Sequence, residues 1–290
     1  MQTRIPGPSG ASLKRRVMSD RIGQPMQFDW SHTPPIASAG EKRSYAMTTR
    51  RNFIGGISAV GAASLVGGNA ALAQDNDGGL TPAPLAGELS PQQALDLLRE
   101  GNASFLRGEQ TRVLTSAQRR LELARGQSPF AAYVTCSDSR VPPELLFGRG
   151  LGELFIIRNA GNTVDTVALG SIEYAVAVLK TPLVVVMGHE SCGAVKAATQ
   201  VVTDNATFPG SIGPMVEPII PAVLAARNEP GDLLDNSVRA NVRRVVGQLR
   251  NHSDPLLLEP QRDGRLWVVG AYYDLDQGAV DFFDLPEGAE

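Results

Sequence analysis

Three short apolar runs constrain the fold of this chain more than any other feature of its sequence. They occupy residues 130–135, 154–157 and 183–187, and each is rich in β-branched or aromatic side chains. Continuous apolar runs of this length are typical of strands that are covered on both faces of a sheet. Between the last two runs, apolar residues recur at helical spacing, namely Leu169, Ile172, Val176 and Leu179. A strand, a helix and a second strand in this order predict an α/β fold with a central, mostly parallel sheet flanked by helices.

Further elements are expected on both sides of this core. The sequence Ser90-Pro91-Gln92-Gln93 offers an N-cap, a proline at the first helical position and a capping-box glutamine, so a helix should begin at Pro91. Its apolar face can pack on the body of the protein or on a partner subunit, and comprises Ala94, Leu97, Leu98 and Phe105. Two later helices are predicted over residues 216–226 and 233–249. A further strand is predicted over residues 265–273.

Composition divides the chain into four parts. The first combines Pro, Gly, Ser and mixed charge without apolar periodicity, which indicates disorder or untranslated upstream sequence. A signal peptide, a Pro/Gly linker and a single globular domain are expected to follow. The four parts are residues 1–46, 47–73, 74–89 and 90–290.

The second part has the features of a twin-arginine export signal. Arg50-Arg51 precedes a weakly apolar run of Gly, Ala and Ser, and Ala71-Leu72-Ala73 offers a small-x-small cleavage site. We therefore expect Met47 to be the true start, the twin-arginine machinery to be a partner, and the mature chain to begin near Gln74 in the periplasm or another exported location. An uncleaved membrane anchor is the alternative interpretation of the same run.

Charge and cysteine content exclude two classes of protein. The chain carries 27 lysines and arginines against 30 aspartates and glutamates, so we expect no basic face for a nucleic acid. Cys136 and Cys192 are the only two cysteines. At most one disulfide can therefore form, and a scaffold held by several disulfides is excluded.

Polar clusters follow two of the predicted strands directly, at residues 136–140 and 188–193. Ligands of open α/β sheets bind outside the carboxyl ends of the strands, so both clusters should lie at the same edge of the sheet. Cys136, His189 and Cys192 would then provide two thiolates and an imidazole. Three such ligands suit a catalytic zinc ion, because they leave the fourth position for water or substrate.

Each member of this trio also has an ordinary interpretation. A single cysteine is most often a small buried hydrophobe, and a single histidine a hydrogen-bonded core residue. The two cysteines could also form a disulfide in an oxidising compartment. The coincidence favours a metal site, because His189 is one of three histidines and lies three residues before Cys192. His252 lies in a polar turn and is given no role, and the absence of a Cys-x-x-Cys motif disfavours a redox protein.

Asp138 and Arg140 lie two and four residues beyond the first cysteine. Most Asp–Arg pairs are only structural, but a bidentate pair beside a zinc ligand can do more. A carboxylate held by Arg140 can accept a hydrogen bond from the nucleophile and orient it. Asp138 could instead bind the metal itself.

The two clusters together resemble the signature of the β-carbonic anhydrases. The likeness continues through residues 153–162, 172–176 and 270–274, and covers roughly residues 91–283. It implies Zn²⁺ held by Cys136, His189 and Cys192, no organic cofactor, and reversible hydration of carbon dioxide to bicarbonate and a proton. It also implies a homodimer or a dimer of dimers, with N-terminal helices that pack on the partner.

The resemblance also assigns residues around the metal. Asp138 and Arg140 match the family's catalytic pair, in which the aspartate orients hydroxide or takes the fourth metal position in a closed state. The residues that match the substrate site are Gln127, Phe155, Tyr174 and the amide of Gly193. Tyr133 stands where the bicarbonate-inhibited branch has tryptophan, which favours the open-site branch. Two alternatives remain, namely hydrolysis of carbonyl sulfide or carbon disulfide on the same fold, and a non-catalytic module that binds zinc or bicarbonate.

Overall fold

The structure is a computed structural model that describes residues 86–109 and 114–289. The predicted upstream segment, the signal peptide and most of the linker lie outside the described residues. Within the described part of the chain, no helix is both long and apolar enough to cross a membrane.

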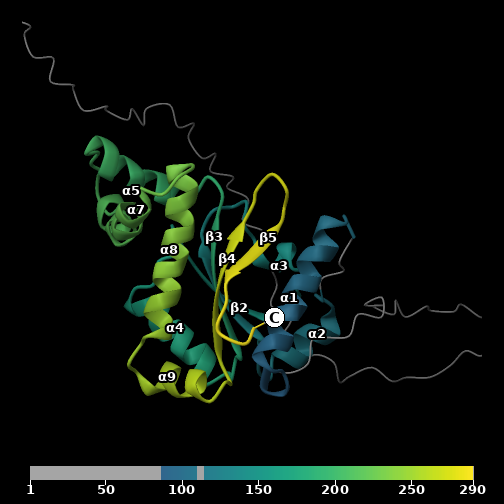
Figure 1. Cartoon of the computed structure of the whole chain (residues 1–290). Helices are drawn as coiled ribbons and strands as arrows, with labels where there is room; N and C mark the ends of the chain where they lie inside the picture. The colour runs from purple at the N-terminus through teal and green to yellow at the C-terminus, as the bar shows by residue number, and fades with distance from the viewer. Residues whose placement is uncertain (1–85, 110–113, 290) are drawn as a thin grey trace, which may run out of the picture. The chain divides into compact units, whose positions relative to one another are not determined.

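A five-stranded sheet with the order β2-β1-β3-β4-β5 forms the centre of the domain (Figure 1). The first four strands are parallel to their neighbours, and β5 runs antiparallel to β4. The mostly parallel sheet predicted from the sequence is therefore confirmed. The strands are β1 (Ala131–Cys136), β2 (Leu154–Asn159), β3 (Leu183–His189), β4 (Trp267–Tyr273) and β5 (Val280–Asp284).

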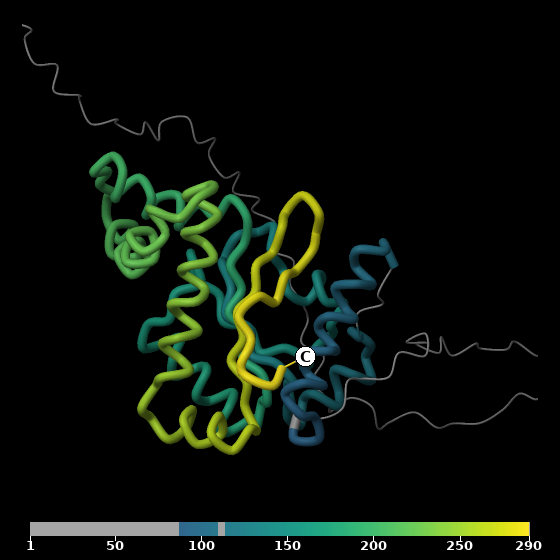
Figure 2. The backbone as a smooth tube through the Cα atoms, in the orientation of Figure 1, coloured from purple at the N-terminus to yellow at the C-terminus, as the bar shows by residue number. Residues whose placement is uncertain are grey.

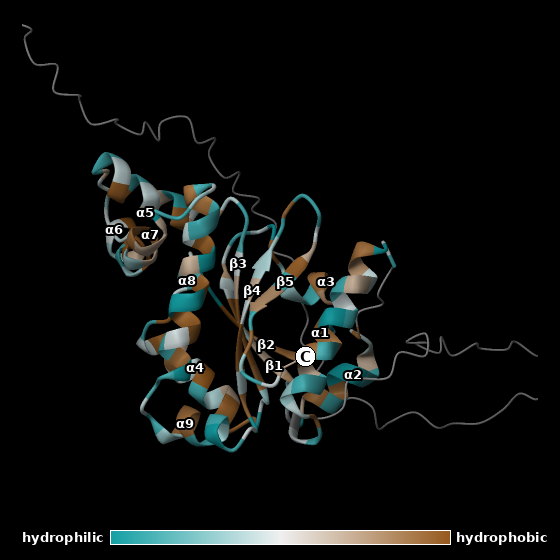
Figure 3. Cartoon of the chain, viewed as in Figure 1, coloured by the Kyte–Doolittle hydropathy of each residue, from teal (hydrophilic) through white to brown (hydrophobic). Residues whose placement is uncertain are grey.

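Helices cover both faces of the sheet, and the sheet separates two apolar cores. In β1, Ala131 and Tyr133 belong to the core beneath α1, whereas Ala132 and Val134 belong to the core beneath α4, α8 and α9. Figure 3 shows the strands as an apolar layer between these helices. The helices that bury residues in these cores include α1 (Pro91–Leu106), α3 (Pro143–Leu146), α4 (Thr166–Ala177), α8 (Leu233–Arg250) and α9 (Pro255–Arg262). Helix α2 (Ala117–Leu123) has no buried residue.

A helical segment connects β3 to α8, as the trace in Figure 2 shows. It contains α5 (Gly193–Asp204), α6 (Ile212–Val216), η3 (Glu217–Ile219) and α7 (Ile220–Ala226). The sequence predicted one helix over residues 216–226, but the structure divides this stretch among three elements. Pro218 and Pro221 lie within it. Proline lacks the amide hydrogen that a continuous helix requires, which accounts for the break.

The predicted helix at Pro91 is confirmed together with its cap. The Ser90 hydroxyl accepts from the Gln93 amide at 3.2 Å, and the Gln93 side chain accepts from the Ser90 amide at 2.8 Å. A short 3₁₀ turn, η2 (Ala86–Glu88), precedes this helix. Helix α4 ends before Leu179, because Lys180 adopts a φ of +60° that closes the helix.

Parallel pairing brings the ends of β1 and β3 to one edge of the sheet. Thr135 lies opposite Met187, so Cys136 and His189 emerge beside each other as the two strands end. The register therefore places the two polar clusters at the same edge.

Candidate metal centre

Cys136, His189 and Cys192 form a buried cluster at this edge of the sheet. Cys136 ends β1, His189 ends β3, and Cys192 is the N-cap of α5. Their ligand atoms all lie within 4.8 Å of one another. The two Sγ atoms are 3.9 Å apart although 56 residues separate the cysteines in the chain.

The donor geometry fits a zinc ion. Zinc–sulfur bonds of about 2.3 Å in a tetrahedral site separate two sulfurs by about 3.8 Å. The observed 3.9 Å matches this value and is far longer than a disulfide bond of about 2.05 Å. Both cysteines are free thiols in this structure.

The imidazole of His189 is oriented to bind a metal through Nε2. Nδ1 lies 2.8 Å from the backbone carbonyl of Glu190, which can only accept, so Nδ1 carries the proton. Nε2 then presents its lone pair, and it is buried without a hydrogen-bond partner among the described residues. An unpaired buried nitrogen beside two thiols costs stability unless it binds a further group, and a metal ion would satisfy it.

The two thiols share one negative charge more readily than either would hold it alone. A hydrogen bond from Cys192 lowers the pKa of Cys136 to about 4, with help from His189 and the amides of Gly161 and Asp138. The neighbouring Cys136 sulfur and burial raise the pKa of Cys192 well above its usual range. A bound cation would favour the thiolate form of both residues.

The turn that carries two of the ligands is fixed from β4 and the loop after it. The amide of Glu190 donates to the Tyr273 carbonyl at 2.9 Å, and the Glu190 carboxylate accepts from the Leu275 amide at 3.0 Å. Ser191 adopts a φ of +53° and directs the chain toward Cys192 and α5. The His189-x-x-Cys192 spacing therefore places both ligands on one side of this turn.

Asp138 and Arg140 form a bidentate ion pair beside the cluster. Nε and one terminal nitrogen of Arg140 donate to the two carboxylate oxygens at 2.9 and 2.8 Å, and the Arg140 amide donates at 3.0 Å. These bonds from Arg140 hold the pKa of Asp138 well below its usual range. One carboxylate oxygen lies 3.9 Å from His189 Nε2, so the carboxylate borders the space between the ligands.

Arg158 is a site residue to which the sequence analysis gave no role. Its guanidinium donates to the Cys136 carbonyl at 3.0 Å and to the Asp138 carbonyl at 2.7 Å. One side chain thus holds the backbone of both Cys136 and Asp138. A charged residue within an otherwise apolar strand was the signal for this role.

The structure does not bring three predicted substrate residues to the cluster within one chain. Phe155 pairs with Ala132, four residues before Cys136, which is about 13 Å along the strand. The Tyr174 ring lies 6.2 Å from the Phe155 ring and is half exposed. Gln127 precedes β1 at the far end of the sheet, in an open groove that also includes Arg120, Leu123 and Leu151.

Gly193, by contrast, directly follows a cluster residue. It is the first residue of α5, and a Cβ placed on it would meet nothing within 4 Å. Its amide therefore lies beside Cys192 at an uncrowded helix N-terminus. Tyr133, three residues before Cys136, is fully buried, and its hydroxyl lies 3.3 Å from the Met187 sulfur.

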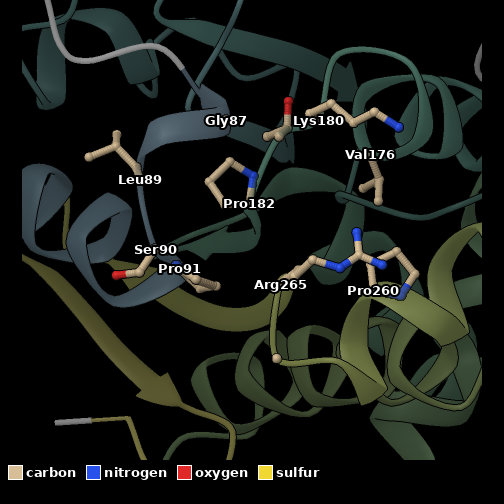
Figure 4. Close-up of a pocket in the computed structure, with 11 residues that line it drawn as sticks. Gly87, Leu89, Ser90, Pro91, Val176, Lys180, Pro182, Pro260 and Arg265 are labelled. Atoms are coloured by element: carbon tan, nitrogen blue, oxygen red, sulfur yellow. The ribbon is translucent and has the colours of Figure 1, made fainter.

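The cavity in Figure 4 lies at the opposite end of the sheet from the cluster. It has a volume of about 440 Å³, and Thr181 and Pro182, just before β3, form part of its wall. Two positively charged side chains line it, and both already have partners. Arg265 pairs with Asp263, and Lys180 donates to the Ala177 carbonyl. We therefore assign the chemistry to the buried cluster and not to this cavity.

Comparison with known proteins identifies relatives of this domain. A family model described as carbonic anhydrase matches residues 131–280. Carbonic anhydrase 2 of Mycobacterium tuberculosis is 40% identical over 189 residues, which are 65% of this chain and 91% of that protein. The carbonic anhydrase of Mycolicibacterium smegmatis is 38% identical over 192 residues, covering 66% of this chain and 93% of that protein.

Solved structures give a consistent result. The β-carbonic anhydrase CcaA superimposes with a TM-score of 0.52 at 26% identity, over 68% of this chain and 94% of that chain. One of two tetrameric β-carbonic anhydrases from Sordaria macrospora gives a TM-score of 0.51 at 27% identity, over 57% of this chain and 85% of that chain.

Proposed function

The chain belongs to the β-carbonic anhydrase family, and we propose that it catalyses the reversible hydration of carbon dioxide to bicarbonate and a proton at a zinc ion. The observation that carries this proposal is the buried Cys136–His189–Cys192 cluster with the ion-paired carboxylate of Asp138 at its border. The ligand set and the pair together have the features of a catalytic site.

Cys136, His189 and Cys192 would hold the ion and leave one position for water or substrate. When bound, zinc supplies Lewis acidity that makes water a nucleophile near neutral pH. Two thiolates and a neutral imidazole would cancel the charge of the zinc ion. The ion would therefore polarise a bound water less than it would with three histidine ligands. The residues around the metal must therefore do more to orient the attacking oxygen.

Asp138 would provide that orientation. Its carboxylate is ionised and borders the ligand atoms, so it can accept a hydrogen bond from the attacking oxygen and direct a lone pair of that oxygen toward carbon dioxide. Arg140 holds both carboxylate oxygens and keeps Asp138 from becoming a fourth metal ligand. The amide of Gly193 can donate to the developing negative charge on the substrate oxygens.

Gln127, Phe155 and Tyr174 can contribute to a site only across a subunit interface. Each lies far along the sheet from the metal ligands of its own chain. The region around Phe155 has features of an interface, because β2 is an edge strand and two valines are exposed, Val167 in α4 and Val178 directly after it. A homodimer or a dimer of dimers would bring these residues to a partner's metal site.

We also propose that the protein is exported through the twin-arginine route, with cleavage near Ala73. This route exports folded proteins, so zinc can occupy both thiolates before an oxidising compartment can join them. Replacing Arg50 and Arg51 with lysine should leave active enzyme in the cytoplasm. Unchanged export of that variant would refute the assignment.

The test of the proposed reaction is stopped-flow hydration of carbon dioxide by the zinc-loaded protein, with carbonyl sulfide and carbon disulfide run in parallel. We expect carbon dioxide to be the preferred substrate. Turnover of a sulfur compound without carbon dioxide hydration would assign the site to the hydrolase alternative. A zinc-loaded protein with no turnover of any of the three would identify a binding module.

A further inference from the structure

Asn241 is a buried polar residue that the proposed mechanism does not use. It lies on the inner face of α8 and is 1% exposed. Its Nδ2 donates to the backbone carbonyl of Gly161 at 2.9 Å across 80 residues of sequence. Its Oδ1 is buried and has no partner among the described residues.

The carbonyl that Asn241 holds belongs to a residue in contact with a metal ligand. The amide of Gly161 donates to the Sγ of Cys136 at 3.4 Å. Within the loop, the Asn159 side chain accepts from the Thr163 amide at 3.0 Å and donates to the Thr163 carbonyl at 2.6 Å, so these bonds span the glycine. The bond from Asn241 adds a contact between this loop and α8.

The backbone at Gly161 has little conformational freedom. Gly161 adopts a φ of +80°, and a Cβ on it would lie 2.5 Å from Ile219 Cδ1 and 3.1 Å from Ala194 Cβ. The backbone therefore passes through a narrow gap beside the helical segment that follows β3. Anchoring its carbonyl restricts the direction in which its amide can point.

We infer that Asn241 is a positioning residue for the metal ligand Cys136, acting through the Gly161 loop. The inference rests on the proposed function, because it concerns the same metal centre. An amide that donates to a thiolate withdraws electron density from the sulfur and orients its lone pairs. Asn241 touches neither metal nor substrate, and it sets the strength and direction of that bond from a distance.

The chemistry of the side chain supports a role beyond packing. Leucine has nearly the same shape and would bury no unpaired oxygen, so packing alone would favour leucine at this position. Asparagine leaves Oδ1 without a partner among the described residues but provides a donor that reaches the Gly161 carbonyl. The bond to the loop is the gain that offsets the cost of burying the oxygen.

Asn241→Leu tests the inference, and Asn236→Leu is its matched control. Asn236 lies on the same helix and also donates its Nδ2 to a loop carbonyl, that of Pro230 at 3.1 Å, but this side chain is only half-buried and its bond goes to the loop before α8. The measurements are zinc affinity by competition with a chelator, the thiolate-to-metal charge-transfer band of the cobalt(II)-loaded protein, and the melting temperature of the metal-free protein.

We expect Asn241→Leu to weaken zinc binding by about 10-fold or more and to shift the cobalt band, as loss of an outer partner of a ligand does. The control should keep the affinity and band of the unaltered protein, and both variants should melt at similar temperatures without metal. If Asn241→Leu does not fold, Asn241→Ser is the second variant. The serine side chain is too short to donate to the Gly161 carbonyl, so it should give the same two changes.

An unchanged zinc affinity and an unchanged cobalt band in a folded Asn241 variant would overturn the inference. Failure of the proposed function would give a different pattern. A chain that hydrates no carbon dioxide but still shows both changes on Asn241→Leu would keep the positioning role, and only the reaction would be wrong.

Discussion

The guanidinium of Arg140 donates two parallel hydrogen bonds to the carboxylate of Asp138, at 2.9 and 2.8 Å. Such a fork fixes both carboxylate oxygens, which a single-point cation cannot do. It also lowers the pKa of Asp138 well below its usual range, so protonation of this carboxylate does not limit activity near neutral pH.

Replacing Arg140 with lysine should reduce turnover while zinc is retained. Lysine carries the same charge but cannot hold both oxygens, so Asp138 gains freedom to take the fourth metal position. The loss should be largest at low pH, where less hydroxide is available to displace the carboxylate. Zinc content and carbon dioxide hydration across pH provide the measurement.

The matched control for this variant is Arg107→Lys. Arg107 forms the same two-point fork with Glu109, at 2.6 and 2.9 Å, on an exposed segment. Its replacement should leave turnover unchanged at every pH. Equal losses in both variants would show that the fork at Arg140 has no special role.

Asp138→Asn should lower turnover by about 10²-fold with zinc retained, which is the scale for losing one positioned catalytic group. The amide is nearly isosteric but can donate where the carboxylate only accepts, so it misorients the nucleophile. Asp281→Asn, at an exposed carboxylate paired with Arg239, should have no such effect. Full zinc and undiminished hydration in Asp138→Asn would show that the pair only shapes its loop.

Mixed subunits test whether Gln127 serves a partner's site. His189→Ala and Gln127→Ala homodimers should both have low activity. A heterodimer of the two variants should regain one working site, which combines the ligands of one chain with Gln127 of the other. Purification with two different tags, followed by carbon dioxide hydration, measures this. A heterodimer no more active than its parents would contradict the shared-site proposal.

Removal of the metal should expose the coupling of the two thiols. The pKa of Cys136 is lowered to about 4, so the folded metal-free protein holds fewer protons than the unfolded chain between about pH 4 and the usual thiol pKa near about 8.5. Stability should therefore rise with pH in this window, relative to a Cys136→Ser variant. Denaturant unfolding at several pH values measures the difference, and parallel curves would contradict it.

The strands of the fold could be predicted because burial on both faces leaves a simple pattern. The runs at β1, β2 and β3 begin within one residue of their predicted starts. Strand β5 was missed, because Asp281 and Asp284 interrupt its apolar residues at the edge of the sheet. The helix predicted over residues 216–226 was wrong as one element, since its prolines divide it.

The clustering of Cys136, His189 and Cys192 could be predicted because their residue types are rare in this sequence and follow strand ends. Arg158 and Asn241 could not be assigned in this way. Their contacts depend on how β2 and α8 pack against loops distant in the sequence. Gln127, Phe155 and Tyr174 were placed by resemblance alone, and one chain does not bring them to the cluster.

The most direct test of the account is a titration of metal-free protein with zinc, in which bound zinc and carbon dioxide hydration are measured on the same samples. We predict no hydration above the uncatalysed rate without metal, and a linear rise that ends at one zinc per chain. The His189→Ala variant should show neither tight zinc binding nor hydration. Hydration that does not depend on zinc, or one bound zinc per chain without hydration, would contradict the account.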